Sequence, residues 1–162
     1  MAIRRLTPED AAEYAALLVV NREYLAPFEP VRDERFFTAE AQRERIESDA
    51  FRYFAILDGD RIAGAVALSN IVLGPAQSAT LSYWVAEAVR GRGLAADAVA
   101  DVIEVAFGEL RLHRLQAGTL VDNVASQRVL EKNGFELIGL ARRYLQIAGG
   151  WRDHLLYQRT VD

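Results

Sequence analysis

The 162-residue sequence contains no cysteine and only two histidines. Without cysteine the chain has no disulfide, no thiolate metal site and no cysteine nucleophile, and two histidines are too few for a histidine-rich metal site. No segment approaches the roughly 18 consecutive apolar residues of a membrane-spanning helix, and no apolar signal-peptide core follows the N-terminus. We therefore expect a cytoplasmic protein that binds no metal and no membrane.

A surplus of positive charge is also missing. Lys and Arg number 19 against 23 Asp and Glu, which gives a net charge of −4 and a pI near 5.3. This balance argues against a nucleic-acid partner. With 51% apolar residues, no internal repeat and no linker, the chain is expected to fold as one domain over residues 1–162.

The first half of the chain alternates helical and extended patterns. A strand is predicted at residues 3–6 and a helix from the Thr7 cap to Asn21, buried through Ala12, Ala15, Ala16 and Val19. Residues 25–30 carry two prolines and apolar side chains, so they are expected to form either a lid over the core or one wall of a substrate cleft. A second helix at 38–49 precedes three antiparallel strands at 53–57, 61–72 and 80–85.

The second half begins with a helix at 95–108, ended by Gly108, and a strand at 112–121. Asn123 is expected to cap a short helix that ends at Asn133-Gly134. Extended residues 135–138 and a hairpin of 140–147 with 151–157, turning at Gly149-Gly150, complete an α/β chain.

The segment Arg90-Gly91-Arg92-Gly93-Leu94-Ala95 joins the strand at 80–85 to the following helix. A glycine turn leaves free backbone N–H groups at the first turn of the helix, and arginines add donors suited to phosphate oxygens. By itself the same turn is also consistent with a plain connection, because neither the G-x-x-x-x-G-K-[ST] pattern nor a dinucleotide-binding unit is present.

The remaining motifs decide between these readings. Arg90-x-x-Gly93-x-Ala95 resembles the pyrophosphate motif of the GCN5-related N-acetyltransferase (GNAT) family, and the order of elements is similar over essentially the whole chain. The segments from Asn123 to Ser126 and from Val129 to Phe135 resemble the N-x-x-S and E-K-x-G-F signature of its RimJ/RimL-like branch. Three further segments are similar to that branch: Tyr83-Trp84, Leu112-His113-Arg114 and Gly150-Trp151-Arg152-Asp153.

The resemblance implies a central, mostly antiparallel, splayed sheet flanked by helices, and acetyl-CoA as cosubstrate. The pyrophosphate would lie on residues 90–95, and the pantetheine arm would pair with the strand ending in Trp84 and Val85. A backbone N–H near those two residues would stabilise the developing oxyanion. Asn123 would both cap its helix and contact the arm, while Arg128 would either reach a CoA phosphate or remain a solvated charge.

The implied reaction is direct transfer of the acetyl group to a primary amine, in that branch the N-terminal α-amine of a ribosomal protein. Ser126 is the candidate partner of the leaving thiolate, because Leu130 stands where many relatives have a tyrosine. The base is less defined: Glu29 and Glu34 lie in the predicted cleft wall, and Glu29 is the candidate. His113 is expected to be structural.

Two alternatives remain open. The acceptor could be a small amine, such as an aminoglycoside, polyamine or amino acid, with acids supplied by the stretch from Phe28 to Glu34. The chain could also be a non-catalytic acyl-CoA-binding sensor, since a tyrosine is missing and no base stands out. The final hairpin could serve as the contact surface of a homodimer.

Overall fold

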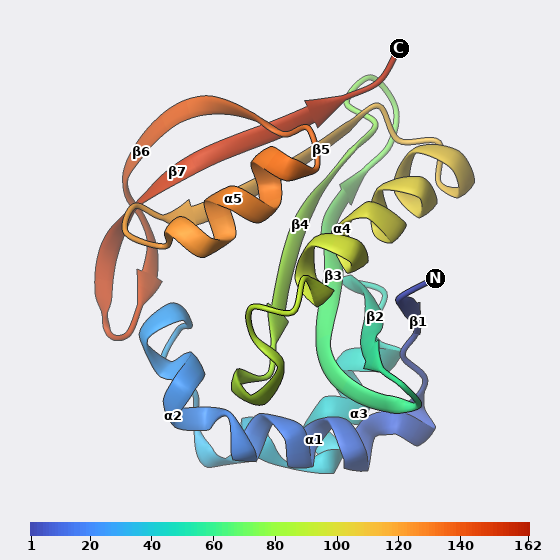
Figure 1. Ribbon diagram of the computed structural model, residues 1–162, viewed down its shortest axis with the longest axis vertical. Coiled ribbons are helices and arrows are strands. Elements are labelled where there is room, and N and C mark those ends of the chain that lie inside the picture. The colour runs from blue at the N-terminus through green and yellow to red at the C-terminus, as the bar shows by residue number, and fades with distance from the viewer.

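The computed structural model describes residues 1–162 and contains one seven-stranded sheet with the order β1-β2-β3-β4-β5-β7-β6 (Figure 1). Neighbouring strands are antiparallel except for β4 and β5, which are parallel. The strands are β1 (Ile3–Arg5), β2 (Phe51–Asp58), β3 (Arg61–Val72), β4 (Ser78–Val85), β5 (Arg114–Leu120), β6 (Glu136–Ile147) and β7 (Gly150–Thr160). The predicted mostly antiparallel sheet is confirmed.

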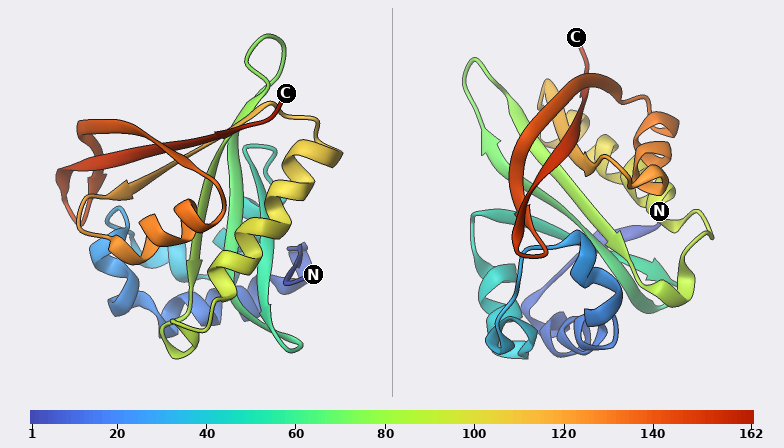
Figure 2. Two further views of the ribbon diagram at one scale, coloured as in Figure 1. Left: turned by 45° about the horizontal axis from the view of Figure 1, so that its top comes forward. Right: turned by 90° about the vertical axis from the view of Figure 1, so that its left-hand side faces the viewer.

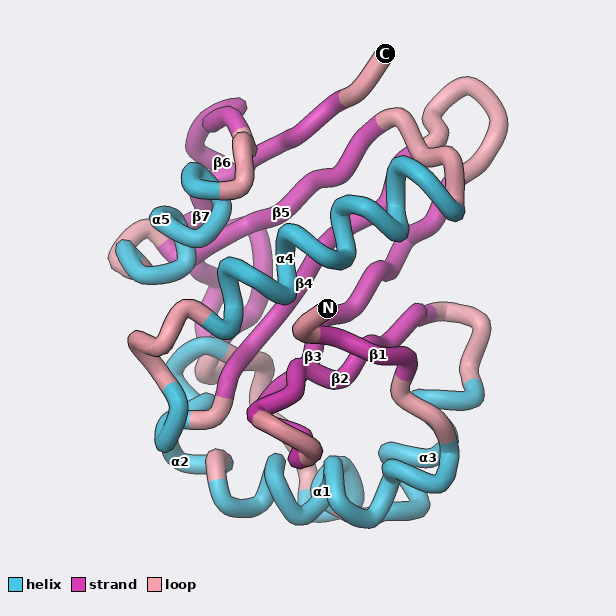
Figure 3. Tube along the Cα trace, turned by 45° about the vertical axis from the view of Figure 1, so that its right-hand side comes forward, coloured by secondary structure: helices cyan, strands magenta, loops and turns pink.

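Helices cover both faces of this sheet (Figures 2 and 3). The five α-helices are α1 (Ala11–Val20), α2 (Arg22–Leu25), α3 (Ala39–Glu47), α4 (Leu94–Glu104) and α5 (Val124–Lys132). Each face of the sheet carries its own hydrophobic core, and successive side chains of β2 point to opposite faces. Phe54 and Ile56 pack with α4, whereas Tyr53 and Ala55 pack with α1 and α3. No helix of the chain combines the length and the apolar character needed to cross a bilayer.

The sheet opens between β4 and β5. These two strands pair only from Ser78 to Thr80, opposite Arg114 to Gln116. Beyond that point β4 remains paired with β3 alone, and β5 turns away with β7 and β6 (Figure 1). The expected splay is therefore present, and it leaves one backbone edge of β4 without a strand partner from Leu81 to Val85.

The N-terminal helices differ from the sequence-based expectation. Helical structure does not stop at Asn21 but continues through α2 and a 3₁₀ turn at Ala26–Phe28. The buried residues of α1 are Ala11, Tyr14, Ala15 and Leu18, so only Ala15 of the four predicted core positions is correct. The sequence of α1 is apolar almost all round, and its buried face is therefore chosen by packing against the sheet rather than by its own pattern.

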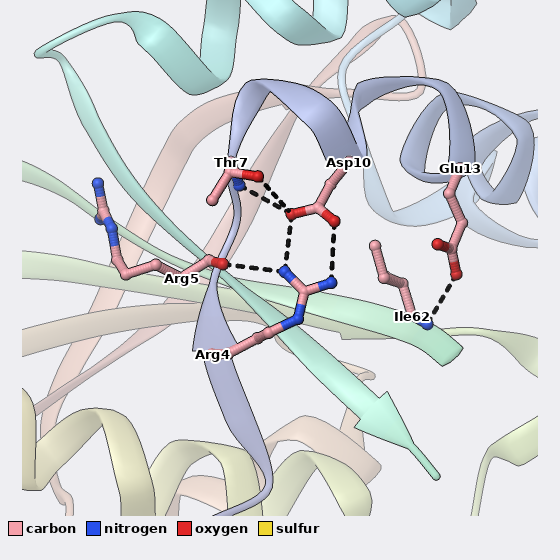
Figure 4. A network of polar contacts seen from close by, with 6 residues as sticks. All are labelled: Arg4, Arg5, Thr7, Asp10, Glu13 and Ile62. Atoms are coloured by element: carbon pink, nitrogen blue, oxygen red, sulfur yellow. Dashed lines mark hydrogen bonds and ion pairs between the residues drawn. The ribbon is translucent and has the colours of Figure 1, made fainter. Parts of the chain in front are cut away.

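The entrance to α1 is fixed by a polar network (Figure 4). Thr7 precedes the turn Pro8–Asp10 as predicted, and its backbone N–H donates to the Asp10 carboxylate at 2.8 Å. Arg4 donates two hydrogen bonds to the same carboxylate at 2.7 and 2.8 Å. Further along, Glu13 accepts a hydrogen bond from the backbone N–H of Ile62 at 3.0 Å, which ties α1 to β3.

Two predicted turns are displaced slightly. Gly108 does not end its helix, because a π-helical turn runs from Val105 to Glu109 and Leu110 N–H bonds back to the carbonyl of Val105 at 2.9 Å. The last hairpin turns at Ala148 and Gly149, with φ of 50° and 83°. Gly150 already belongs to β7, so the positive-φ positions lie one residue earlier than predicted.

Candidate active site

The glycine loop is built to leave backbone donors free. Gly91 and Gly93 have φ of 75° and 84°, which only glycine adopts without strain. Gly93 is the N-cap of α4, and its carbonyl accepts the first helical bond, from Asp97 N–H at 3.1 Å. The N–H groups of Leu94 and Ala95 consequently have no helical acceptor, and they coincide with the positive end of the helix dipole. This geometry suits an anion such as a pyrophosphate.

A cavity of about 460 Å³ lies beside this loop and is called the loop cavity here. Three cationic side chains line it, namely Arg90, Arg128 and Lys132, and no carboxylate does. Such a lining fits a ligand that carries several phosphates. The remaining lining residues predicted from sequence are Trp84, Val85, Gly91, Gly93, Leu94, Ala95, Asn123 and Ser126.

Arg92 is the one predicted cofactor residue that does not line the loop cavity. Its guanidinium forms a bidentate pair with Asp58, both bonds measuring 2.8 Å. This pair raises the pKa of Arg92 and lowers that of Asp58. Of the two arginines of the loop, only Arg90 therefore lines the loop cavity.

A second cavity of about 440 Å³ occupies the opening between β4 and β5 and is called the splay cavity. Tyr83, Trp84, Asn123 and Ser126 line both cavities. The two cavities therefore meet at the open edge of β4. A ligand in the loop cavity and a ligand in the splay cavity can make contact there, as a transfer reaction requires.

Ser126 lies at this junction and is held by two neighbours. The side chain of Asn123 accepts a hydrogen bond from Ser126 N–H at 3.2 Å, which confirms the predicted helix cap. Tyr83 Oη lies 2.8 Å from Ser126 Oγ, a contact in which either hydroxyl can be the donor, and 3.1 Å from the Ser126 carbonyl oxygen, which can only accept. Burial raises the pKa of Tyr83 to about 12, so the phenol stays protonated near neutral pH.

Tyr83 is a residue whose role sequence reasoning missed. It was noted only as part of a similarity to the RimJ/RimL-like branch, because nothing in the local pattern links it to Ser126, 43 residues away. Leu130, where a tyrosine was looked for, is fully buried in the core. Tyr83 thus brings a phenol to Ser126 from β4 instead of from α5.

Glu29 lies on the wall of the splay cavity. Burial raises the pKa of its carboxyl, opposed by the nearby charges of Arg32 and Arg45. Its backbone carbonyl accepts a hydrogen bond from Ala148 N–H at 2.8 Å, which joins the segment after α2 to the β6–β7 turn. Several residues of the segment 25–30 line cavities. This favours the interpretation of the segment as one wall of a cleft over its interpretation as a lid on the core.

The other acids of that segment lie elsewhere. Glu34 pairs with Arg22 at 2.6 Å, and the Asp33 side chain caps a 3₁₀ turn through Phe36 N–H. Neither residue lines either cavity. The cluster of acids considered for a polycationic acceptor is therefore not formed there.

The two histidines have different environments. His113 is exposed, and its backbone N–H bonds to the Gln77 carbonyl at 2.7 Å. His154 is only 3% exposed and lines the splay cavity. Its Nδ1 lies 3.0 Å from the carbonyl oxygen of Arg152, which can only accept, so Nδ1 carries hydrogen and Nε2 of the neutral ring is left as an acceptor. Sequence reasoning gave His154 no role.

Comparisons with known proteins agree with this geometry. The family described as Acetyltransferase (GNAT) domain matches residues 1–136. The chain is 38% identical over 161 residues to the probable N-acetyltransferase YjcK of Bacillus subtilis (strain 168), covering 94% of this chain and 89% of that protein. It is 32% identical over 171 residues to the ribosomal protein uS5-alanine N-acetyltransferase of Escherichia coli (strain K12), covering 99% and 88%.

Solved structures give the same result. The ribosomal-protein-S5-alanine acetyltransferase from Vibrio fischeri matches with a TM-score of 0.94 and 32% identity, over 99% of this chain and 92% of that one. Mycobacterium smegmatis RimJ in complex with CoA-disulfide matches with a TM-score of 0.90 and 30% identity, over 98% and 81%. The chain belongs to the GNAT family and is an acetyl-CoA-dependent N-acetyltransferase of that family.

Proposed function

We propose that this enzyme transfers the acetyl group of acetyl-CoA to the N-terminal α-amine of a protein, and that ribosomal proteins are the first acceptors to test. The observation that carries this proposal is the charge of the splay cavity. One carboxylate, Glu29, lines it against two guanidinium groups, Arg32 and Arg45. A polyamine or aminoglycoside carries several positive charges and would be repelled there more strongly than a peptide N-terminus, which carries one.

The loop cavity is the proposed site of acetyl-CoA, which supplies the activated acetyl group. The free N–H groups after Gly93 and the charges of Arg90, Arg128 and Lys132 are suited to its phosphates. The unpaired edge of β4 from Leu81 to Val85 offers backbone donors and acceptors to the amides of the pantetheine arm. A backbone N–H at Trp84 or Val85 is the proposed donor to the carbonyl oxygen.

Proton movement is assigned to Glu29, in the splay cavity, and to Ser126, at the junction of the two cavities. Glu29 takes the amine proton, directly or through water, and its raised pKa brings it closer to that of an α-amine, near 8. Ser126 Oγ–H donates to the leaving sulfur. Tyr83 is a positioning residue. Its one hydroxyl hydrogen can go to the Ser126 carbonyl or to Ser126 Oγ, and in the second arrangement the serine hydrogen is free to face the loop cavity.

The experiment is an assay of thiol release from acetyl-CoA. Because the chain has no cysteine, the protein itself adds no thiol signal to the assay. Peptides with free Ala or Ser N-termini are compared with the same peptides acetylated at the N-terminus, with polyamines and with aminoglycosides. Turnover with the free peptides alone is expected. Turnover with the small amines alone would contradict the proposal, and acetyl-CoA binding without any turnover would favour the sensor alternative.

We further infer that residues 1–162 act as one domain. The two hydrophobic cores lie on opposite faces of the same sheet and share strands β2 and β3. The two cavities are both built on that sheet, so one cooperative unfolding transition is expected in a thermal melt.

A further inference from the structure

Two arginines are fixed side by side in the splay cavity. The guanidinium carbons of Arg32 and Arg45 lie 4.3 and 5.3 Å from the centre of the Phe36 ring. Arg45 also lies 5.0 Å from the centre of the Phe51 ring and donates to Tyr53 Oη at 2.6 Å. Aromatic contacts on this scale hold a guanidinium plane in place while leaving its edge donors free.

These two charges lack adequate partners within the protein. Arg45 takes part in none of the salt bridges of the chain. Arg32 Nε is buried without a hydrogen-bond partner, and the Glu29 carboxylate lies 3.9 Å away, beyond hydrogen-bond distance. Burial also lowers the pKa of Arg32. A buried guanidinium with unused donors is stabilised when a carboxylate fills the space beside it.

The two ends of the splay cavity lie on different sides of the sheet. Ser126 belongs to α5, whose core contacts are with α4, whereas Arg45 belongs to α3, which packs on the other face. A free amino acid fixes its amine and α-carboxylate two bonds apart, whereas a peptide can carry a further carboxylate at a greater distance from the amine. Each further residue of an extended peptide adds roughly 3.3 Å.

We propose that Arg32 and Arg45 bind a carboxylate of the acceptor, so that the preferred acceptor is a peptide N-terminus with Asp or Glu at its second or third residue. This inference rests on the proposed function, because it places the amine at Ser126 and the carboxylate at the arginines. The arginine pair reads the residues that follow the amine.

The test uses three peptides that differ at one position: Ser-Glu-Ala, Ser-Gln-Ala and Ser-Lys-Ala, each extended by the same neutral sequence. The full enzyme is assayed for kcat/KM with each peptide at saturating acetyl-CoA. A charge-assisted contact of this kind corresponds to a preference for the Glu peptide over the Lys peptide of at least about tenfold. Repeating the series with the acidic residue at the third position identifies which residue is read.

Variants assign the preference to the arginines. Arg45→Gln and Arg32→Gln are each expected to bring kcat/KM for the Glu peptide to within about threefold of kcat/KM for the Lys peptide. Arg43→Gln, on the same helix as Arg45 but exposed beside Glu47, is the matched control and should keep the wild-type ratio. Because the two variants lie on separate segments, either one that melts like the wild type is sufficient.

The outcomes separate this inference from the proposed function. Equal kcat/KM for the three peptides would leave N-terminal acetylation in place and overturn the arginine site, as would an unchanged ratio in both arginine variants. Acetylation of free aspartate or glutamate with no acetylation of any peptide would overturn both the protein acceptor and the peptide geometry proposed here.

Discussion

Replacing Tyr83 by Phe tests how the site prepares Ser126. The change deletes one hydroxyl, and with it the 2.8 Å contact to Ser126 Oγ and the 3.1 Å bond to the Ser126 carbonyl. The aromatic ring stays, so packing against the core is retained. A neutral hydrogen bond contributes about 0.5–1.5 kcal/mol, which corresponds to a loss of about 2- to 13-fold in kcat if the contact orients the serine during transfer.

The assay is steady-state thiol release with the best peptide acceptor. Tyr83→Phe is expected to lower kcat while the KM for acetyl-CoA stays within about twofold, because the change removes a contact to Ser126 and leaves the cationic residues of the loop cavity in place. Ser126→Ala should lower kcat by about 10- to 100-fold. Since Tyr83 acts through Ser126, the double variant should be no slower than Ser126→Ala alone.

Two results would refute this reasoning. Additive losses in the double variant would mean that Tyr83 acts independently of Ser126. The second concerns pH. Burial raises the pKa of Tyr83 to about 12, so the phenol remains protonated and wild type and Tyr83→Phe should share one pH profile between about pH 6 and 10. A limb in that range that disappears in the Phe variant would identify Tyr83 as a titrating acid instead.

Four further changes test other parts of the structure. Gly93→Glu should abolish acetyl-CoA binding by calorimetry, because it adds a negative charge and φ of 84° strains any side chain there. Glu29→Gln should lower kcat/KM at least about tenfold and remove an acid limb lying above the pH expected for an ordinary carboxyl, since burial raises this pKa. Gly64→Ala should reduce both stability and activity, because a Cβ there would lie 2.2 Å from the Trp84 carbonyl oxygen; an unchanged thermal melt would contradict this. Asp10→Asn should cost about 1 kcal/mol at neutral pH after solvent screening, and the difference in urea unfolding should shrink as pH falls towards 2, because the bond from Arg4 lowers the pKa of Asp10 to about 2.

Local sequence signals predicted the parts of the site that depend on local geometry. The glycine turn leads into α4 at Gly93 and leaves its first N–H groups free, as expected, and Asn123 caps α5 as expected. Both predictions concern hydrogen bonds that close within a few residues, so neighbouring residue types are sufficient to specify them.

The parts that failed depend on contacts between distant segments. The pattern of α1 did not reveal its buried face, and the last hairpin did not reveal that β7, not β6, would lie beside β5. Tyr83 and His154 line the splay cavity only because the sheet opens where β4 and β5 separate. The sequence also did not distinguish the two arginines of the loop: the side chain of Arg92 pairs with Asp58, in the neighbouring β2–β3 hairpin.

The charge of the whole chain was also a poor guide to its ligands. A net charge of −4 is compatible with a cationic acceptor, yet both cavities that meet at Ser126 are lined by more cationic than anionic side chains. The surplus acids lie mainly outside these cavities, several of them in ion pairs on the surface. In a cleft with apolar walls the local charges dominate the potential that a ligand meets. The loop cavity can therefore attract a phosphate-rich cosubstrate although the protein as a whole is acidic.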